Sequence, residues 1–418
     1  MSGSLLVPAG VDPAVAPLLA ARALRGFADG FVAVLLPVYL LALGLDTLAV
    51  GFISTATLAG SALATLALGA AGHRWQQRSL LLGAALLMAA TGLGFAGLAS
   101  FGPLLVVAFI GTLNPSSGDV SVFLPLEHAR LAAAAGGPAR TALFARYSLT
   151  GSLSAAVGAL AAGLPPWLAA HAGVSMLQAL RAMFVLYALV GGAVAWLYLR
   201  LPQPAPGEAV QRAAPLGPSR AIVLRLAALF SVDAFAGGLL VNSLMTLWLI
   251  QRFGFSLAQA GVFFFWTGLL SAASQLAAPL VARRIGLLNT MVFTHIPANL
   301  CLIGAALCTS LPLAMVLLLV RSALSQMDVP TRTAFVMAVV TPAERTAAAS
   351  FTAVPRSLAA AASPTLAGAL LAAGALSAPL LACGVLKIVY DVAVLFAFRR
   401  VRTDEADQPA GISRAADK

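Results

Sequence analysis

The fold is decided by a long apolar segment near the start of the chain that contains one carboxylate. Residues 16–44 read APLLAARALRGFADGFVAVLLPVYLLALG, and Asp29 lies well inside this run. A second run, residues 221–250, carries Asp233 at a matching depth, 204 residues later. Runs of this length span a hydrocarbon core of about 30 Å as a helix, where a carboxylate is costly. Two carboxylates at corresponding places predict a duplicated helical membrane protein and mark its candidate working centre.

Composition independently places the chain in a membrane. Of the 418 residues, 61% are hydrophobic and only 9% are charged, whereas about 25% of the residues in a soluble domain are charged. The apolar runs show no alternation with a period of two, which argues against an outer-membrane barrel. The predicted fold class is therefore all-α, a polytopic membrane protein.

We expect twelve spans, six in each half of the chain. The first six are residues 16–44, 47–72, 79–100, 103–126, 140–164 and 177–199, and the last six are 221–250, 257–282, 287–309, 312–339, 344–373 and 377–398. Prolines and glycines concentrate in residues 200–220, which is typical of a flexible linker. The predicted domains are an N-terminal bundle (1–199), a cytoplasmic linker (200–220), a C-terminal bundle (221–400) and a cytoplasmic polar tail (401–418).

The distribution of basic residues predicts that both termini are cytoplasmic. With this orientation only Arg181 and Arg252 lie in outer loops, and the remaining loop and tail arginines face the cytoplasm. The net charge of +11 then faces anionic lipid and does not indicate nucleic-acid binding. The first residues lack a basic region and a cleavage site, so we expect no removable signal peptide.

Short sequence echoes indicate that the two halves are duplicated. The echoes are Arg25-Gly-Phe-Ala-Asp29-Gly-Phe with Leu229-Phe-Ser-Val-Asp233-Ala-Phe, Gly44 to Gly51 with Gly254 to Gly261, Asp119-Val120 with Asp328-Val329, and Arg140-Thr-Ala142 with Arg345-Thr-Ala347. An even number of spans in each half makes the repeats parallel. Rocking of one half against the other is the expected mechanism of alternating access.

The loop after the second span carries a motif known from one transporter family. It reads Leu68-Gly69-Ala-Ala-Gly72-His73-Arg74-Trp-Gln-Gln-Arg78, and Ala282-Arg283-Arg284 occupies the corresponding place in the second half. Together with the layout of six plus six spans, this resembles the major facilitator superfamily, whose signature loop has aspartate where this chain has His73. The resemblance implies a secondary transporter, with proton-coupled drug exporters as the functional analogy.

Two features of those exporters are altered here. Their arginine in the fourth span is missing from Val106 to Asn114, although Arg321 lies in the equivalent tenth span. Their glycine-spaced motif in the fifth span is only hinted at by Gly151, Gly158 and Gly163. The analogy therefore favours antiport without fixing it.

Asp29 and Asp233 are the candidate proton-coupling residues. Desolvation would let either carboxyl bind a proton near working pH. The alternative for Asp29 is a structural ion pair with Arg25, one turn away, or with Arg22. Asp233 has no basic residue within four positions. We place Asn114, Asn242 and Tyr39 in the same cavity.

A second duplicated set suggests a cytoplasmic gate. Its candidates are Asp119, Glu127, Arg146, Asp328, Arg332 and Arg356. Arg146 would pair with Asp119 or Glu127, and Arg356 with Asp328, when the inside is closed. The run Asn114-Pro115-Ser-Ser-Gly118-Asp119 predicts a kinked or unwound helix at a cavity, and Glu127 is expected near the membrane exit as a gate or surface charge.

Other functional classes fit less well. Four scattered histidines, with neither HExxH nor GxSxG, argue against an enzyme, and no Walker loop indicates an ATP-driven pump. Cys301, Cys308 and Cys383 are expected to pack in the core, without a disulfide, metal or cofactor role. We predict a monomeric secondary transporter in a bacterial inner membrane, with proton-coupled efflux of a small organic molecule as the leading function. The alternative is proton-coupled uptake or exchange of a small anionic metabolite bound by Arg146, Arg332 and Arg356.

Overall fold

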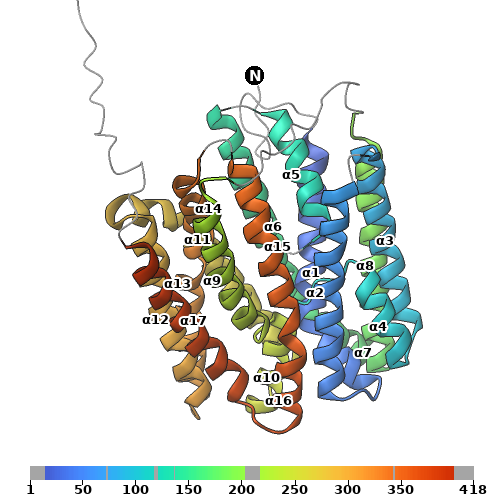
Figure 1. Cartoon of the computed structure of the whole chain (residues 1–418). Helices are drawn as coiled ribbons and strands as arrows, with labels where there is room; N and C mark the ends of the chain where they lie inside the picture. Colours follow the sequence, from blue (N-terminus) through green and yellow to red (C-terminus); the bar gives the residue numbers. More distant parts are fainter. Residues whose placement is uncertain are drawn as a thin grey trace, which may run out of the picture.

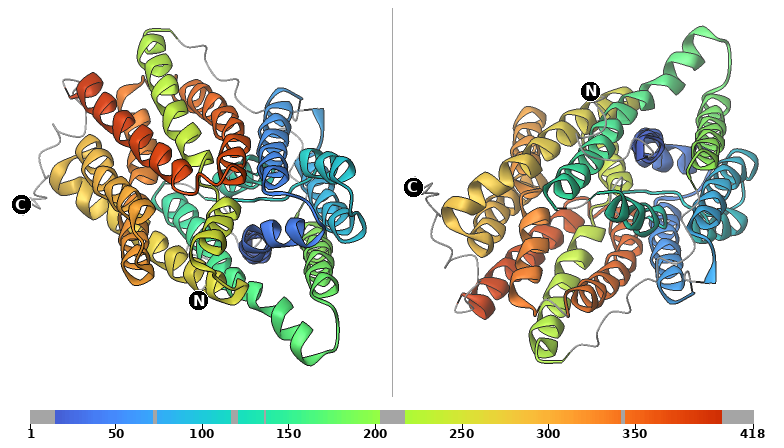
Figure 2. Two further views of the ribbon diagram at one scale, coloured as in Figure 1. Left: turned by 90° about the horizontal axis from the view of Figure 1, so that it is seen from below. Right: turned by 90° about the horizontal axis from the view of Figure 1, so that it is seen from above.

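The protein is a single bundle of helices that run up and down (Figure 1). The computed structural model describes residues 15–71, 74–116, 121–135, 137–202, 217–341 and 344–399, and these residues contain no strand. Ten of its helical segments are long and apolar enough to cross a membrane. Viewed along the bundle, the first half of the chain groups on one side and the second half on the other (Figure 2).

Each half makes six crossings. In the first half these are α1 (Ala16–Ala42), α2 (Thr47–Ala71), α3 (Gln77–Gly97), α4 (Phe101–Ile110) with α5 (Phe123–Ala134), α6 (Gly137–Leu160) with η3 (Ala161–Gly163) and α7 (Leu164–His171), and α8 (Met176–Leu199). In the second half they are α9 (Arg220–Gly238) with α10 (Asn242–Phe253), α11 (Leu257–Ile285), α12 (Leu287–Leu307), α13 (Leu311–Ser325) with α14 (Asp328–Val339), α15 (Arg345–Ala362) with α16 (Pro364–Ala372), and α17 (Ala378–Phe398). The predicted all-α fold with twelve spans is confirmed.

The two ends of the bundle can be named from the chain path. We call the linker side the end that holds the start of α1, the end of α8 and the start of α9 (top of Figure 1). The distal side is the opposite end, where α1 ends at Ala42 and α17 begins at Ala378.

The fourth crossing is broken where Asn114 and Pro115 predicted it. Helix α4 ends at Ile110, and Asn114 accepts a hydrogen bond from the backbone N–H of Ser116 at 3.1 Å, an Asx turn that competes with helix. Because the break takes up residues, α5 continues to Ala134 and not to the predicted end at residue 126. Glu127 is thereby carried into the bundle.

Small residues allow corresponding helices of each half to pack closely. A Cβ on Gly30 of α1 would lie 2.1 Å from the carbonyl oxygen of Ala155 on α6. In the second half, a Cβ on Gly238 of α9 would lie 2.2 Å from the carbonyl oxygen of Ala360 on α15. Such close backbone approach is how membrane helices gain packing energy without a hydrophobic driving force.

Contacts between the two halves concentrate toward the distal side. Thr365 of α16 donates its hydroxyl to Thr55 of α2 at 2.8 Å, and Gln251 of α10 donates to Thr47 at 3.2 Å. A Cβ on Gly368 would lie 2.8 Å from the Cα of Gly51. We call these five α2 and α16 residues and Gln251 the distal seal, because they hold α2 against α16 and α10.

Candidate functional site

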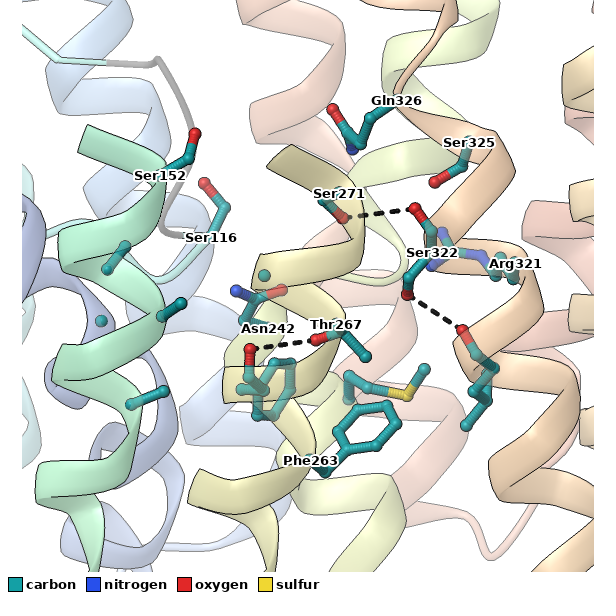
Figure 3. A pocket seen from close by; sticks show the side chains of 18 of the residues that line it. Ser116, Ser152, Asn242, Phe263, Thr267, Ser271, Arg321, Ser322, Ser325 and Gln326 are labelled. Atoms are coloured by element: carbon teal, nitrogen blue, oxygen red, sulfur yellow. Dashed lines mark hydrogen bonds between the residues drawn. The ribbon is translucent and has the colours of Figure 1, made fainter. Parts of the chain in front are cut away.

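A cavity of about 360 Å³ lies between the halves (Figure 3). Its walls come from α1 and α6 of the first half and from α9, α10, α11, α13 and α17 of the second. The polar side chains that line it are Arg22, Ser116, Ser152, Asn242, Thr267, Ser271, Gln275, Arg321, Ser322, Ser325, Gln326 and Lys387. Its volume falls in the range of small-molecule sites, about 300–1,000 Å³.

The charge of the cavity wall has one sign. Arg22, Arg321 and Lys387 line it, and no aspartate or glutamate does so among the residues described. Since low-dielectric surroundings strengthen electrostatic interactions, such a wall favours negatively charged ligands over positively charged ones.

Arg22 is positioned by its neighbours on α6. Its guanidinium stacks over the ring of Tyr147, 5.1 Å from the ring centroid. A Cβ on Gly151 would lie 2.2 Å from Nε of Arg22. Glycine at 151 therefore leaves the space that the guanidinium occupies beside the cavity.

Arg321 of α13 is the cation of the wall with the fewest protein partners. Its Nε is buried without a hydrogen-bond partner, and across the described ranges the side chain forms neither a hydrogen bond nor an ion pair. It lies beside Ser322 and Ser325 on the cavity wall (Figure 3). A buried Nε–H group without a hydrogen-bond partner is costly, and a ligand in the cavity that accepts a hydrogen bond from it would remove this cost.

Lys387 belongs to a buried charge cluster in the second half. It donates to Oδ1 of Asp233, whose Oδ2 accepts from Arg332 at 2.9 Å. Arg332 also lies 3.5 Å from Oδ2 of Asp328, one turn away on α14. Asp233 is thus held between two cations, which favour its ionised form, although its own helix supplies none.

The same cluster extends to a histidine that sequence reasoning did not single out. Nδ1 of His295 on α12 lies 2.8 Å from Oδ1 of Asp391 on α17, and Asn299 donates to Oδ2 at 3.4 Å. His295, Asn299 and Asp391 are at most 3% exposed. The only sequence signal was a charged or polar residue at the centre of an apolar run, which His295 and Asp391 share.

The first half contains a matching buried cluster with its charges exchanged. Glu127 of α5 is fully buried, and it accepts hydrogen bonds from Arg25 of α1, Tyr147 of α6 and Tyr198 of α8. Full burial contradicts the alternative that Glu127 is a surface charge, and its role in a gate stays a prediction. The guanidinium of Arg25 also packs over the ring of Phe123 at 4.2 Å.

Among the described residues, the expected pairings of Glu127 with Arg146 and of Asp328 with Arg356 are replaced by other ion pairs in this conformation. Glu127 is held by Arg25, and Asp328 by Arg332, so neither is paired as predicted with Arg146 or Arg356. The side chains of Arg146 and Arg356 are exposed. Asp119 lies outside the described residues. Both arginines stay candidates for a gate in another conformation.

The predicted cavity residues separate into two groups. Asn242 lines the cavity, and Asp29 is partly exposed on α1 close to Arg22 and Arg25. Asn114 is buried in the α4–α5 break. Tyr39 is also fully buried. Its ring packs against Phe184 in a tilted arrangement and its hydroxyl donates to the carbonyl of Phe95, so its place in the cavity was wrongly predicted.

The signature-like loops lie on the linker side. Arg78 donates to the carbonyl of Leu199 and so ties α3 to the end of α8. Arg74, Arg283 and Arg284 are exposed, and Gly69 has open space around it. Gly72 and His73 fall outside the described residues, so the predicted relay through them stays a prediction.

Comparisons with known proteins identify the family. The profile described as "Major Facilitator Superfamily" matches residues 18–325. The chain belongs to this superfamily of membrane transporters.

Individual relatives are distant. The uncharacterized membrane protein YJR124C of Saccharomyces cerevisiae is 24% identical over 358 residues, covering 77% of this chain and 80% of the yeast protein. Among solved structures, the nucleoside transporter NupG matches with a TM-score of 0.69 at 15% identity, covering 93% of this chain and 100% of that one. The human organic anion transporter MFSD10 matches with a TM-score of 0.61 at 20% identity, covering 92% and 100%. At these identities the structural matches establish the fold.

Proposed function

We propose that this protein is a secondary transporter that carries a small organic anion through the cavity between its two halves. The observation that supports this is the cationic wall made by Arg22, Arg321 and Lys387, with no carboxylate among the described lining residues. An organic cation entering the same space would meet like charges in surroundings of low dielectric, which is unfavourable.

Size and polarity narrow the class of ligand. About 360 Å³ suits a molecule with the size of a di- or tricarboxylate or a sugar phosphate. Ser271, Thr267 and Asn242 add hydroxyl and amide groups next to the cations. Two guanidinium forks, Arg22 from α1 and Arg321 from α13, suit planar carboxylate or phosphate oxygens.

The charge of the cavity wall favours the alternative function predicted from the sequence over the leading one. The leading prediction was proton-coupled efflux of a small organic molecule, by analogy with drug exporters. The alternative was a small anionic metabolite, and the cavity supports it through residues other than those predicted. Arg22, Arg321 and Lys387 line the cavity, although Lys387 also pairs with Asp233, whereas Arg332 pairs with Asp233 and is not a lining residue.

Transport would proceed by alternating access about the cavity. The distal seal closes one end in this conformation, so we infer that substrate exchanges with the linker side. Since basic residues predict a cytoplasmic linker, this is an inward-facing state of an inner-membrane protein. Transport to the other side requires the distal seal to open while the linker side closes.

A binding panel tests the proposal directly. Purified protein is titrated calorimetrically with succinate, citrate and glucose 6-phosphate, and with glucose and tetraethylammonium as neutral and cationic controls. We expect at least one anion to bind, more weakly as salt is raised, and neither control to bind. Binding of tetraethylammonium with no binding of any anion would refute the proposed substrate class.

A further inference from the structure

The His295–Asp391 pair is a buried acid–base group connected to the cavity. Asp391 and Lys387 lie one turn apart on α17, and therefore on the same face of the helix. Lys387 lines the cavity and binds Asp233. Asp233 also interacts electrostatically with His295. A change of charge at Lys387 therefore alters the electrostatic environment of His295, and a change of charge at His295 alters that of Lys387.

The histidine is arranged to accept a proton. A carboxylate only accepts hydrogen bonds, so Nδ1, which faces Oδ1 of Asp391, carries the hydrogen, and Nε2 is left to take up a proton. The imidazolium formed would stay paired with Asp391, while Asn299 satisfies the second carboxylate oxygen. Imidazole is the side chain whose unperturbed protonation changes between about pH 5 and pH 8.

The charge balance of the cluster depends on this histidine. Among the described residues, Asp233, Asp328 and Asp391 are buried, and the cations in direct contact with Asp233 and Asp328 are Arg332 and Lys387, whereas Asp391 faces the histidine. Protonation of the imidazole places a positive charge next to Asp391. An isolated charge is expensive in a low-dielectric interior, so the cluster gains from the added proton.

The other groups that face the cluster do not replace the histidine. Arg356 of α15 interacts electrostatically with Asp233 and Asp328, but it forms no ion pair with either of them among the described residues. Tyr390 of α17 faces the histidine ring, with the ring centroids 6.3 Å apart, and its buried hydroxyl has no hydrogen-bond partner. Arg321 of α13 lies on the cavity side of the cluster.

We propose that His295, paired with Asp391, binds a proton that is carried together with the anion. An anion at Lys387 competes with Asp233 for the ammonium group, and a positive imidazolium beside Asp233 compensates for the ammonium it loses. Proton and anion then bind cooperatively, and each raises the affinity for the other. The proton moves from water to Nε2 on binding and returns on release, so no other reactant is required. The anion part of this inference rests on the proposed function.

Isothermal titration calorimetry with an anion that binds in the panel above tests the coupling between proton binding and anion binding. Heats measured in buffers of different ionisation enthalpy give the number of protons taken up on binding. We expect wild-type protein to take up a substantial fraction of a proton per anion near neutral pH, and His295→Gln to take up almost none, with an affinity that no longer varies with pH. His171→Gln, an exposed histidine stacked on Trp167 at the distal side, is the matched control and should behave as wild type.

A second measurement does not depend on any anion. Nitrogen NMR of histidine-labelled protein follows the ring of His295, assigned from the His295→Gln spectrum. The ring signals are recorded between about pH 5 and pH 8, and we expect them to differ between wild type and Lys387→Gln because a positive charge near the ring is lost. A ring that stays neutral across this range, or proton uptake that persists in His295→Gln, overturns the coupling role. Failure of every anion to bind, with the ring titrating as expected, would instead refute the proposed function.

Discussion

Arg321 provides the sharpest test of the cavity, because removing it should weaken binding without weakening the fold. Arg321→Gln takes away a guanidinium that faces the cavity and has no ion pair within the described chain. A hydrogen bond to a charged group contributes about 1.5–3 kcal/mol, and each 1.4 kcal/mol is about a factor of ten. We therefore expect the affinity for the anion to fall roughly 10- to 150-fold.

The stability of the same variant should move in the other direction or not at all. In wild-type protein Nε of Arg321 is buried without a hydrogen-bond partner, which carries a desolvation cost. Because no carboxylate loses its partner, Arg321→Gln should unfold at the same temperature as wild type or slightly higher. A structural arginine would give the opposite pattern, with a lowered unfolding temperature.

Calorimetric titration with the best-binding panel anion and a thermal unfolding scan supply the two measurements. Arg284→Gln removes the same charge from an exposed site at the end of α11 and should keep wild-type affinity. Arg321→Lys keeps the charge but loses the planar fork, so its affinity should lie between the two. Unchanged affinity in Arg321→Gln, measured with intact folding, would refute the assignment of the cavity wall.

Three further predictions concern the rest of the bundle. Arg25→Met and Glu127→Leu should each destabilise the protein by about 3–5 kcal/mol in thermal or denaturant unfolding, because each leaves a buried charge unpaired, and the double variant should recover much of the loss. Gly368→Val should open the distal side, since its Cβ would meet Gly51 at 2.8 Å; overpacking of about 1–3 kcal/mol should speed labelling of a distal cysteine by an impermeant maleimide. Hydrogen bonds from Ser219, Thr341 and the Gly217 backbone lower the pKa of Glu344 from 4.5 to about 2, so the stabilisation they give is present above about pH 4.5 and lost as pH falls toward 2.

Each of these has an outcome that would contradict it. The ion-pair prediction fails if the double variant is as unstable as the sum of the single ones. The prediction for the distal seal fails if Gly368→Val leaves the labelling rate unchanged. Gly69→Val, at a position with open space, is the control and should label at the wild-type rate. For Glu344, the difference in unfolding temperature between wild type and Glu344→Gln should be largest near neutral pH and shrink as the solution is acidified. A constant difference would show that the carboxylate is not the source.

The sequence was informative where the signal was local. Apolar runs placed most span ends to within about three residues, but the fourth and fifth spans end later than predicted, at Ala134 and His171. Asn114 with Pro115 predicted the break in the fourth crossing, since both act on the backbone at their own position. Asp233 is buried, as its position inside a span suggested, whereas Asp29 is partly exposed, and the proton-coupling role of both stays a prediction.

Partners could not be predicted, since they lie on other helices. Asp233 has no neighbouring base in sequence, yet Lys387 reaches it across 154 residues and Arg332 across 99. Glu127 was placed too near the surface because the number of residues taken up by the helix break was unknown. His295 and Asp391 are 96 residues apart on different helices, and neither local sequence indicates that the two side chains form a pair. The sequence showed only that Arg321 lies in the tenth span. That its Nε has no hydrogen-bond partner depends on how the neighbouring helices pack around it.

Transport into proteoliposomes tests the central claim most directly. Purified protein is reconstituted, an inward proton gradient is imposed, and uptake of the radiolabelled panel anion that binds best is followed against its own gradient, with Arg321→Gln liposomes in parallel. We predict accumulation above the equilibrium level in wild-type liposomes, collapse of that accumulation when the proton gradient is dissipated, and little uptake in the variant. Uphill movement of tetraethylammonium with no movement of any anion would contradict the account.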